Sequence, residues 1–227
     1  MMDLIKQIRT LRSTILWTYL PTLAVLGLIT GYALATGKKV WYFTNDPFVL
    51  GHLPFYAGVL SNLAIVLWSA GAAICFFSSG ILSEDSPGRR FRRFLFFSGL
   101  LTSLWLFDDL FQFHRILYIK YLHVSATLIF AVYGLLALWY LVHFRKEIGE
   151  AEYLLLGLAL AFFAAAVVFD TISVLPRGRT AFSDFLKFFG IVSWVAYFTR
   201  TGRQALREAY KGDLAVDNTG QGGTKGK

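Results

Sequence analysis

The chain has 227 residues, of which 56% are hydrophobic, 17% aromatic and only 16% charged. This is too apolar for a soluble domain of this size, so the composition predicts an integral membrane protein. The formal net charge of +8 does not indicate nucleic-acid binding, because basic residues beside membrane spans set topology and attract anionic lipid. The single cysteine, Cys75, excludes an intramolecular disulfide and a thiolate zinc cluster.

Long apolar stretches divide the chain into spans, each of which needs about 20 residues. Six stretches qualify: Ile15–Thr36, Phe55–Ile81, Phe94–Phe113, Tyr121–Phe144, Tyr153–Leu175 and Phe182–Thr199. They predict an all-α fold, a polytopic membrane helix bundle of about six transmembrane helices, forming one domain over residues 1–210. Residues 211–227 are polar and glycine-rich, which predicts a disordered tail.

The distribution of basic residues predicts the orientation of these spans. Most of the 22 lysines and arginines lie near the two ends of the chain and in the connections after the second and fourth spans. The side richer in Lys and Arg faces the cytoplasm, so both termini, and the tail, are expected there. Ala33-Leu34-Ala35 resembles a signal-peptidase site, but the apolar run before it is longer than a signal core, which favours an uncleaved anchor. We therefore predict a multi-pass protein of the cell membrane in contact with lipid.

Ionisable residues interrupt the apolar spans on the side opposite the termini. Intramembrane charges are costly and are functional candidates by default. Two adjacent carboxylates and an imidazole end the third span, an aspartate ends the fifth, and an aspartate and a lysine begin the sixth. The predicted polar cluster comprises Asp108, Asp109, Gln112, His114, Asp170, Asp184 and Lys187.

Helical spacing indicates which of these side chains face the bundle. Asp109 shares one stripe of the third span with Ser98, Thr102, Trp105 and Gln112, so it is expected to face neighbouring helices. On an ideal helix His114 lies about 140° from Asp109, so the two share a ligand only if the helix ends or distorts between them. The tryptophans, which mostly lie near the predicted span ends, predict an aromatic belt at the membrane interfaces.

The segment Asp108–His114, with its Asp-Asp-x4-His motif, together with Phe169-Asp170 and the segment 184–194, resembles a family of uncharacterised multi-pass bacterial membrane proteins. The resemblance covers the third to sixth spans. The family pattern has an acidic residue after the histidine, where this chain has Arg115. A fainter similarity is to the ceramidase and adiponectin-receptor superfamily of membrane hydrolases, which implies zinc held by Asp and His. Those proteins carry a His-x-x-x-His pair in a late span, whereas the fifth and sixth spans here contain no histidine.

Three functions follow as hypotheses. In the first, the polar cluster is not catalytic: it stabilises the bundle, or binds a small molecule, an ion or a protein partner. This is the leading interpretation, because no nucleophile elbow, HExxH motif or phosphate loop is present. The second is a metal-dependent hydrolase acting on a lipid at the outer leaflet, with zinc on Asp109, His114 and Asp170 and with His52 or His123 as further ligands. The third is proton or ion transport through Asp109, Asp170 and Lys187.

Overall fold

The computed structural model describes residues 4–40, 43, 47–54, 56–82, 89–171 and 179–221. Throughout these residues the regular secondary structure is helical, with no strand, as the sequence predicts. Residue contacts divide the chain into two compact units, Met1–Val59 and Leu60–Lys227, where the sequence alone predicts one domain through residue 210. The second unit contains the predicted polar cluster.

The first unit contains the long helix α1 (Leu4–Ala35) and the short helix α3 (Pro47–Leu50). Helix α1 includes most of the predicted first span and ends in a Schellman motif. Gly37 adopts φ 66°, a left-handed conformation that costs glycine little. This lets Lys38 N–H donate to the Ala33 carbonyl at 2.9 Å and Gly37 N–H to the Leu34 carbonyl at 3.2 Å, which satisfies two carbonyls at the helix end.

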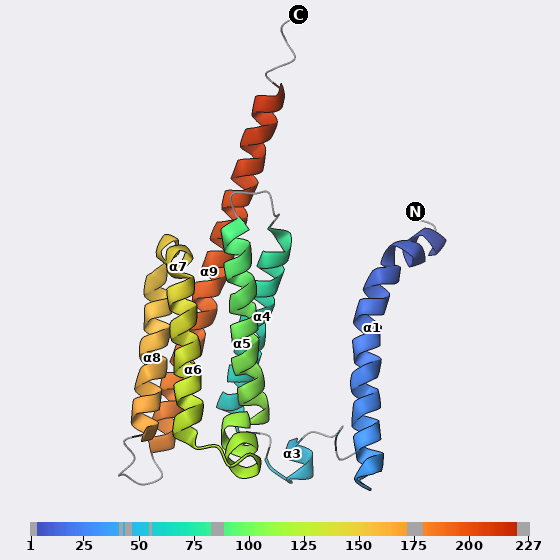
Figure 1. The fold of residues 1–227 in the computed structure, drawn as a ribbon, viewed down its shortest axis with the longest axis vertical. Helices are drawn as coiled ribbons and strands as arrows, with labels where there is room; N and C mark the ends of the chain where they lie inside the picture. Colours follow the sequence, from blue (N-terminus) through green and yellow to red (C-terminus); the bar gives the residue numbers. More distant parts are fainter. Residues whose placement is uncertain are drawn as a thin grey trace, which may run out of the picture. The chain divides into compact units, whose positions relative to one another are not determined.

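The second unit is a bundle of long helices that run side by side (Figure 1). Its elements are α4 (Val59–Ile81), α5 (Arg89–Phe111), the π-helix η1 (Phe113–Tyr121), α6 (Ala126–His143), α7 (Arg145–Glu150), α8 (Tyr153–Thr171) and α9 (Arg179–Gln221). Ser125 caps α6, because its side chain accepts a hydrogen bond from Leu128 N–H at 3.3 Å. Such a cap satisfies one of the unpaired amides of the first turn.

Each predicted span of this unit overlaps a helix, but the boundaries differ by several residues; α6, for example, begins at Ala126 and not at Tyr121. Helix α5 begins at Arg89, five residues before the predicted start at Phe94. The predicted span counted only apolar residues, whereas arginine is polar but forms helix well. Helix α9 continues through Lys211 to Gln221, so the described part of the predicted disordered tail is helical. Extending an existing helix costs far less than starting one, and the polar composition alone does not reveal this.

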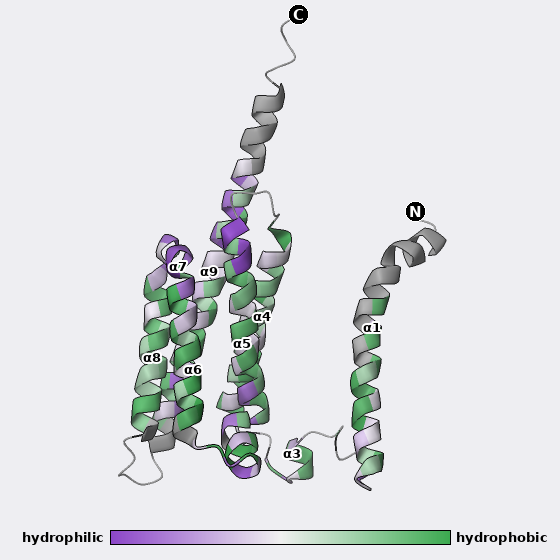
Figure 2. Ribbon diagram, viewed as in Figure 1, coloured by the Kyte–Doolittle hydropathy of each residue, from purple (hydrophilic) through white to green (hydrophobic). Residues whose placement is uncertain are grey.

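Two described helices, α4 and α5, are long and apolar enough to cross a membrane. Three others contain shorter apolar segments: Leu23–Ala35 in α1, Leu128–His143 in α6 and Tyr153–Phe169 in α8. The apolar residues occupy the middle of the bundle helices, while hydrophilic residues gather toward their ends (Figure 2).

Glycines allow two pairs of helices to approach closely. A Cβ atom added to Gly99 of α5 would lie 2.8 Å from the Phe76 ring of α4. At Gly190 of α9, an added Cβ atom would lie 2.6 Å from the Phe163 ring of α8. Both distances are below van der Waals contact, so a larger residue at either position would push a ring out of place.

The bundle buries aromatic residues and exposes many aliphatic ones. Phe94, Trp194, Tyr197 and Phe198 are at most 1% exposed. In contrast, large apolar side chains on the outer faces of five helices are at least 39% exposed; they include Val66, Phe77, Leu100, Leu104, Leu135, Leu138, Leu154, Phe185 and Val192. Isolated exposed apolar residues are normal in proteins, but extended apolar patches mark contact with a membrane or a partner.

Candidate functional site

The end of α5 positions the candidate site. The α-helix ends at Phe111, and Gln112 adopts a left-handed conformation with φ 52° and ψ 40°. The π-helix η1 begins directly after it. A left-handed non-glycine residue is strained by about 1–3 kcal/mol and persists only where its surroundings hold it. Here the Gln112 side chain donates to the Asp109 carbonyl at 2.7 Å, which closes the end of the helix.

This break turns the chain back toward Asp108. The backbone N–H of His114 donates to Asp108 Oδ1 at 3.0 Å, and His114 Nδ1 lies 2.6 Å from Asp108 Oδ2. The Tyr133 hydroxyl, from α6, also donates to Asp108 Oδ1, at 2.8 Å. Asp108 therefore links the end of α5 to η1 and α6.

Asp109 has a different set of partners. Trp68 Nε1, from α4, donates to Asp109 Oδ2 at 3.0 Å. Lys187 Nζ, from α9, forms an ion pair with Asp109 Oδ1. Asp109 thus joins α5 to helices that come before and after it in the chain.

Both carboxylates are buried, with Asp108 6% and Asp109 8% exposed. Burying an unpaired charge is prohibitively costly, and all four carboxylate oxygens contact a donor or a histidine nitrogen. We call these two carboxylates and their partners Trp68, His114, Tyr133 and Lys187 the Asp108–Asp109 network. His114 is the one partner with a second ring nitrogen, Nε2, and no described residue forms a hydrogen bond with it.

An aromatic layer packs next to Asp109. Trp68 stacks on Phe163 with centroids 5.9 Å apart, and Trp105 lies 4.9 Å from Trp194. Trp194 Nε1 donates to Thr102 Oγ1 at 3.0 Å. Trp68 and Trp194 are 2% and 1% exposed, so the prediction that the tryptophans mostly form an interfacial belt is wrong for these two. Each indole N–H has a polar partner inside the bundle, which removes the reason for an indole to lie at the interface.

The network includes a group with the chemistry of a metal site. One ligand atom from each of Asp108, Asp109 and His114 lies within 4.8 Å of the others. The predicted metal set contained Asp109, His114 and Asp170. The described group contains Asp108 instead, and the side chain of Asp170 lies outside the described residues. Carboxylate and imidazole ligands suit zinc, and three protein ligands with an open position are typical of catalytic zinc.

Comparison with known proteins identifies a family. Residues 19–201 match a family described as Domain of unknown function (DUF8692). The chain belongs to this family. No curated protein and no solved structure shows a significant match. The DUF8692 match includes every residue of the Asp108–Asp109 network, so the network lies within the region that defines the family.

Of the seven residues predicted to form the polar cluster of this DUF8692 protein, five are brought together. Gln112, His114 and Lys187 join the two carboxylates. Asp184 is exposed and does not contact the network within the described residues. Asp170 is the penultimate residue of α8.

The structure decides how the histidines lie relative to the carboxylates. On an ideal helix His114 would point away from Asp109, but α5 ends at Phe111, and this break brings His114 to Asp108. His123 is exposed and does not join the metal group among the described residues, and His52 belongs to the first unit.

Trp68 and Tyr133 are members of the network that the sequence reasoning missed. Each lies within an apolar span, where a Trp or Tyr is expected in either the core or the interface. One clue is that both can donate a hydrogen bond, and the buried carboxylates of the third span need such donors.

Proposed function

We propose that this DUF8692 protein is a multi-pass membrane protein with six spans and both termini in the cytoplasm. Two observations support this arrangement: the apolar side chains exposed on the outer faces of the bundle, and the hydrophilic residues gathered toward its ends (Figure 2). The Asp108–Asp109 network then lies at the outer end of the bundle, opposite the termini.

We further propose that this network has a non-catalytic role: it stabilises the bundle and presents one open ligand atom, His114 Nε2, to a small polar ligand or ion. The observation that carries this proposal is the saturation of both carboxylates by partners from the protein. A carboxylate that accepts the Nδ1 proton of a histidine selects the tautomer with its lone pair on Nε2. His114 is thereby oriented for a ligand, while Asp109 and Lys187 brace the helices around it.

Paired substitutions test the stabilising role. Asp109→Asn leaves the ammonium of Lys187 without its counter-charge. Breaking a fully buried ion pair costs about 3–5 kcal/mol, and the cost here should be smaller because the Lys187 side chain is 38% exposed and solvent screens its charge. We expect a clear fall in Tm of the detergent-solubilised protein. Lys187→Met should cost a similar amount, whereas the double variant should recover most of the loss, because neither charge is then unpaired.

Asp184→Asn is the matched control, because Asp184 is an exposed carboxylate at the start of the same helix as Lys187. Its Tm should change little, since such surface substitutions usually stay within about 0.5 kcal/mol. The stabilising role is refuted if Asp109→Asn melts like the wild type, or if the losses of the two single variants simply add in the double variant.

The second candidate is a zinc-dependent hydrolase acting on an outer-leaflet lipid. The observation that favours it is the convergence of ligand atoms from Asp108, Asp109 and His114. When bound, zinc lowers the pKa of a coordinated water to about 7 and so supplies hydroxide. For Asp109 to act as a ligand, it would have to give up its contact with Lys187 or with Trp68.

Elemental analysis tests the metal site on which the second candidate depends. The protein is purified without chelators, exposed to Zn²⁺ and desalted. Close to one zinc per chain in the wild type, and none in His114→Gln, would support the hydrolase. Wild-type protein free of zinc after the same treatment would rule out the metal site and leave the non-catalytic proposal standing.

A further inference from the structure

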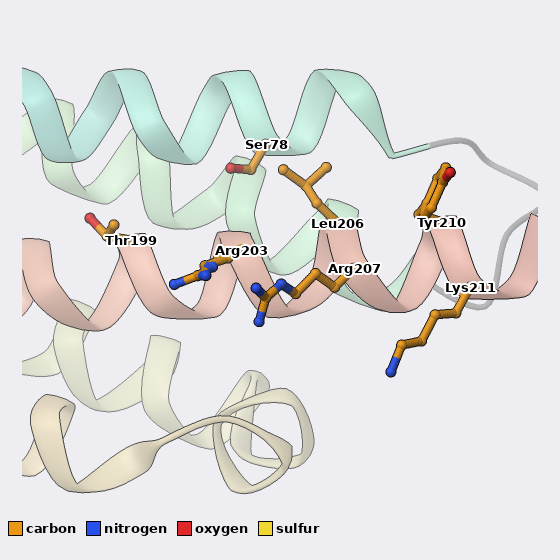
Figure 3. A pocket seen from close by; sticks show the side chains of 7 residues that line it. All are labelled: Ser78, Thr199, Arg203, Leu206, Arg207, Tyr210 and Lys211. Atoms are coloured by element: carbon orange, nitrogen blue, oxygen red, sulfur yellow. The ribbon is translucent and has the colours of Figure 1, made fainter.

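A second polar site lies at the opposite end of the bundle from the Asp108–Asp109 network. It is a groove of about 560 Å³ between α4 and α9. Ser78 of α4 and five residues of α9, Arg203, Leu206, Arg207, Tyr210 and Lys211, line most of it (Figure 3). Its volume falls within the usual range for small-ligand sites. We call it the basic groove.

The basic groove carries three positive charges on one face of α9. Arg203, Arg207 and Lys211 are spaced four residues apart, so they lie one above the other along the helix. All three are exposed, and within the part of the chain that the structure describes none forms an ion pair. Like charges at this spacing repel one another, so an anion bound between them would relieve the repulsion.

Neighbouring basic residues at the same end of the bundle do have partners. Arg200 forms an ion pair with Glu152, and Arg90 forms one with Glu150, in which Nη2 lies 3.3 Å from Oε1. Glu150 and Glu152 are thus engaged outside the groove. Glu208, the acidic residue of α9 next to Arg207, accepts a hydrogen bond from Gln204 at 2.9 Å and forms no ion pair with a described residue. The three cations of the groove therefore have no ion-pair partner among the described residues.

The wall of the groove opposite the cations is held close by a glycine. A Cβ atom added to Gly202 of α9 would lie 2.6 Å from Ser78 Oγ of α4, so only glycine leaves room for this hydroxyl beside the helix. Ser78 and Leu206 lie side by side between α4 and α9, while the charged ends of Arg203, Arg207 and Lys211 extend from α9 away from Ser78 (Figure 3). The groove therefore combines a row of cations, which suit a phosphate, with a wall formed by Ser78 and Leu206.

Apolar surface continues from the groove along the bundle. Phe77, next to Ser78 in α4, is 69% exposed, and Val66, eleven residues earlier on the same face of the helix, is 63% exposed. Helix α4 ends at Ile81, and the apolar part of α9 gives way to charged residues from Arg200 onward. In the membrane arrangement proposed above, this places the cations at headgroup level and the apolar side chains at the depth of the acyl chains.

We propose that the basic groove binds an anionic phospholipid of the inner leaflet, with its phosphate between Arg203, Arg207 and Lys211 and its acyl chains along α4. A free phosphate would use the same cations but would gain nothing from Phe77 and Val66. The proposal rests on the membrane-spanning arrangement, and it does not depend on the role of the Asp108–Asp109 network.

Lipid binding by the full-length chain in detergent tests this proposal. The probe is fluorescent phosphatidylglycerol, with phosphatidylcholine and inorganic phosphate as competitors. The groove variant carries Arg203→Gln, Arg207→Gln and Lys211→Gln. The matched control carries Arg89→Gln, Arg93→Gln and Lys146→Gln, which removes the same charges from exposed positions at the same end of the bundle.

We expect the groove variant to bind phosphatidylglycerol roughly 100-fold more weakly, the factor that three basic residues contribute at a membrane surface. The control should bind like the wild type, and phosphatidylcholine should compete poorly. If the groove variant does not fold, Arg207→Glu alone should still weaken binding markedly, because it replaces an attractive charge with a repulsive one.

Three results would overturn the proposal. Equal losses of phosphatidylglycerol binding in the groove variant and in the control would show that binding depends only on general surface charge. Unchanged binding in the groove variant would place the lipid elsewhere. Displacement of the probe by inorganic phosphate as readily as by unlabelled phosphatidylglycerol would indicate a site for a free anion. Extraction of the chain from membranes without detergent would instead refute the membrane arrangement itself.

Discussion

Asp108 and Asp109 are neighbours in the chain, yet their carboxylates have different partners. Successive residues of a helix point about 100° apart, so Asp109 faces α4 and α9 while Asp108 faces η1 and α6. One dipeptide therefore ties together elements on two sides of α5. Hydrogen bonds to an ionised carboxylate are stronger than those between neutral groups. The contribution of each donor to stability should therefore be measurable by substituting that donor.

Trp68→Phe removes the indole donor to Asp109 and retains an aromatic ring. Hydrogen bonds to charged groups contribute about 1.5–3 kcal/mol, so the Tm of the detergent-solubilised protein should fall. Trp139→Phe is the control, because Trp139 is 52% exposed and its side chain lies outside the network. Equal Tm values for the two variants would show that the Trp68–Asp109 bond contributes nothing to stability.

At the scale of the elements, the bundle depends on close packing between helices. Gly190 of α9 lies against the ring of Phe163 of α8, which in turn stacks on Trp68 of α4. Phe163 thereby transmits the position of α9 to the aromatic layer beside Asp109. An added methyl group at residue 190 would displace the ring and disturb this layer.

Gly190→Ala should therefore destabilise the protein by about 1–3 kcal/mol, the usual cost of overpacking. Gly157→Ala is the matched control: it is a glycine of α8 with nothing within 4 Å of an added Cβ atom. There the higher helix propensity of alanine should raise stability by about 0.8–1 kcal/mol or leave it unchanged. Thermal unfolding in detergent measures both. A Gly190→Ala protein as stable as the wild type would mean that the Phe163 ring moves aside at no cost.

At the scale of the whole molecule, the proposed topology places η1 outside the cell and α7 inside it. Lys120 of η1 and Gly149 of α7 are exposed positions for engineered cysteines, and the native thiol of Cys75 is buried. In a Cys75→Ala background, a membrane-impermeant maleimide should label Lys120→Cys in intact cells. It should label Gly149→Cys only after permeabilisation. The opposite pattern would invert the proposed orientation, and labelling of both in intact cells would refute the proposed topology.

The helices and the inward face of α5 were predictable from the sequence alone. Ser98, Thr102 and Asp109 recur at helical spacing and are all buried. Apolar stretches and helical periodicity are local properties, and they persist whatever the rest of the chain does. The extent of α9 was not predictable in this way, because its polar end continues a helix that apolar residues begin.

The sequence by itself determined the all-helical class and the buried carboxylates of α5, since both follow from short stretches of residues. Only the tertiary structure decided which groups neutralise those carboxylates. Lys187 is 78 residues from Asp109 in the chain, and no local pattern specifies that pairing. His114 reaches Asp108 only because the backbone turns left-handed at Gln112. Contacts of this kind arise from packing between distant segments, which fixes geometry that composition and periodicity do not contain.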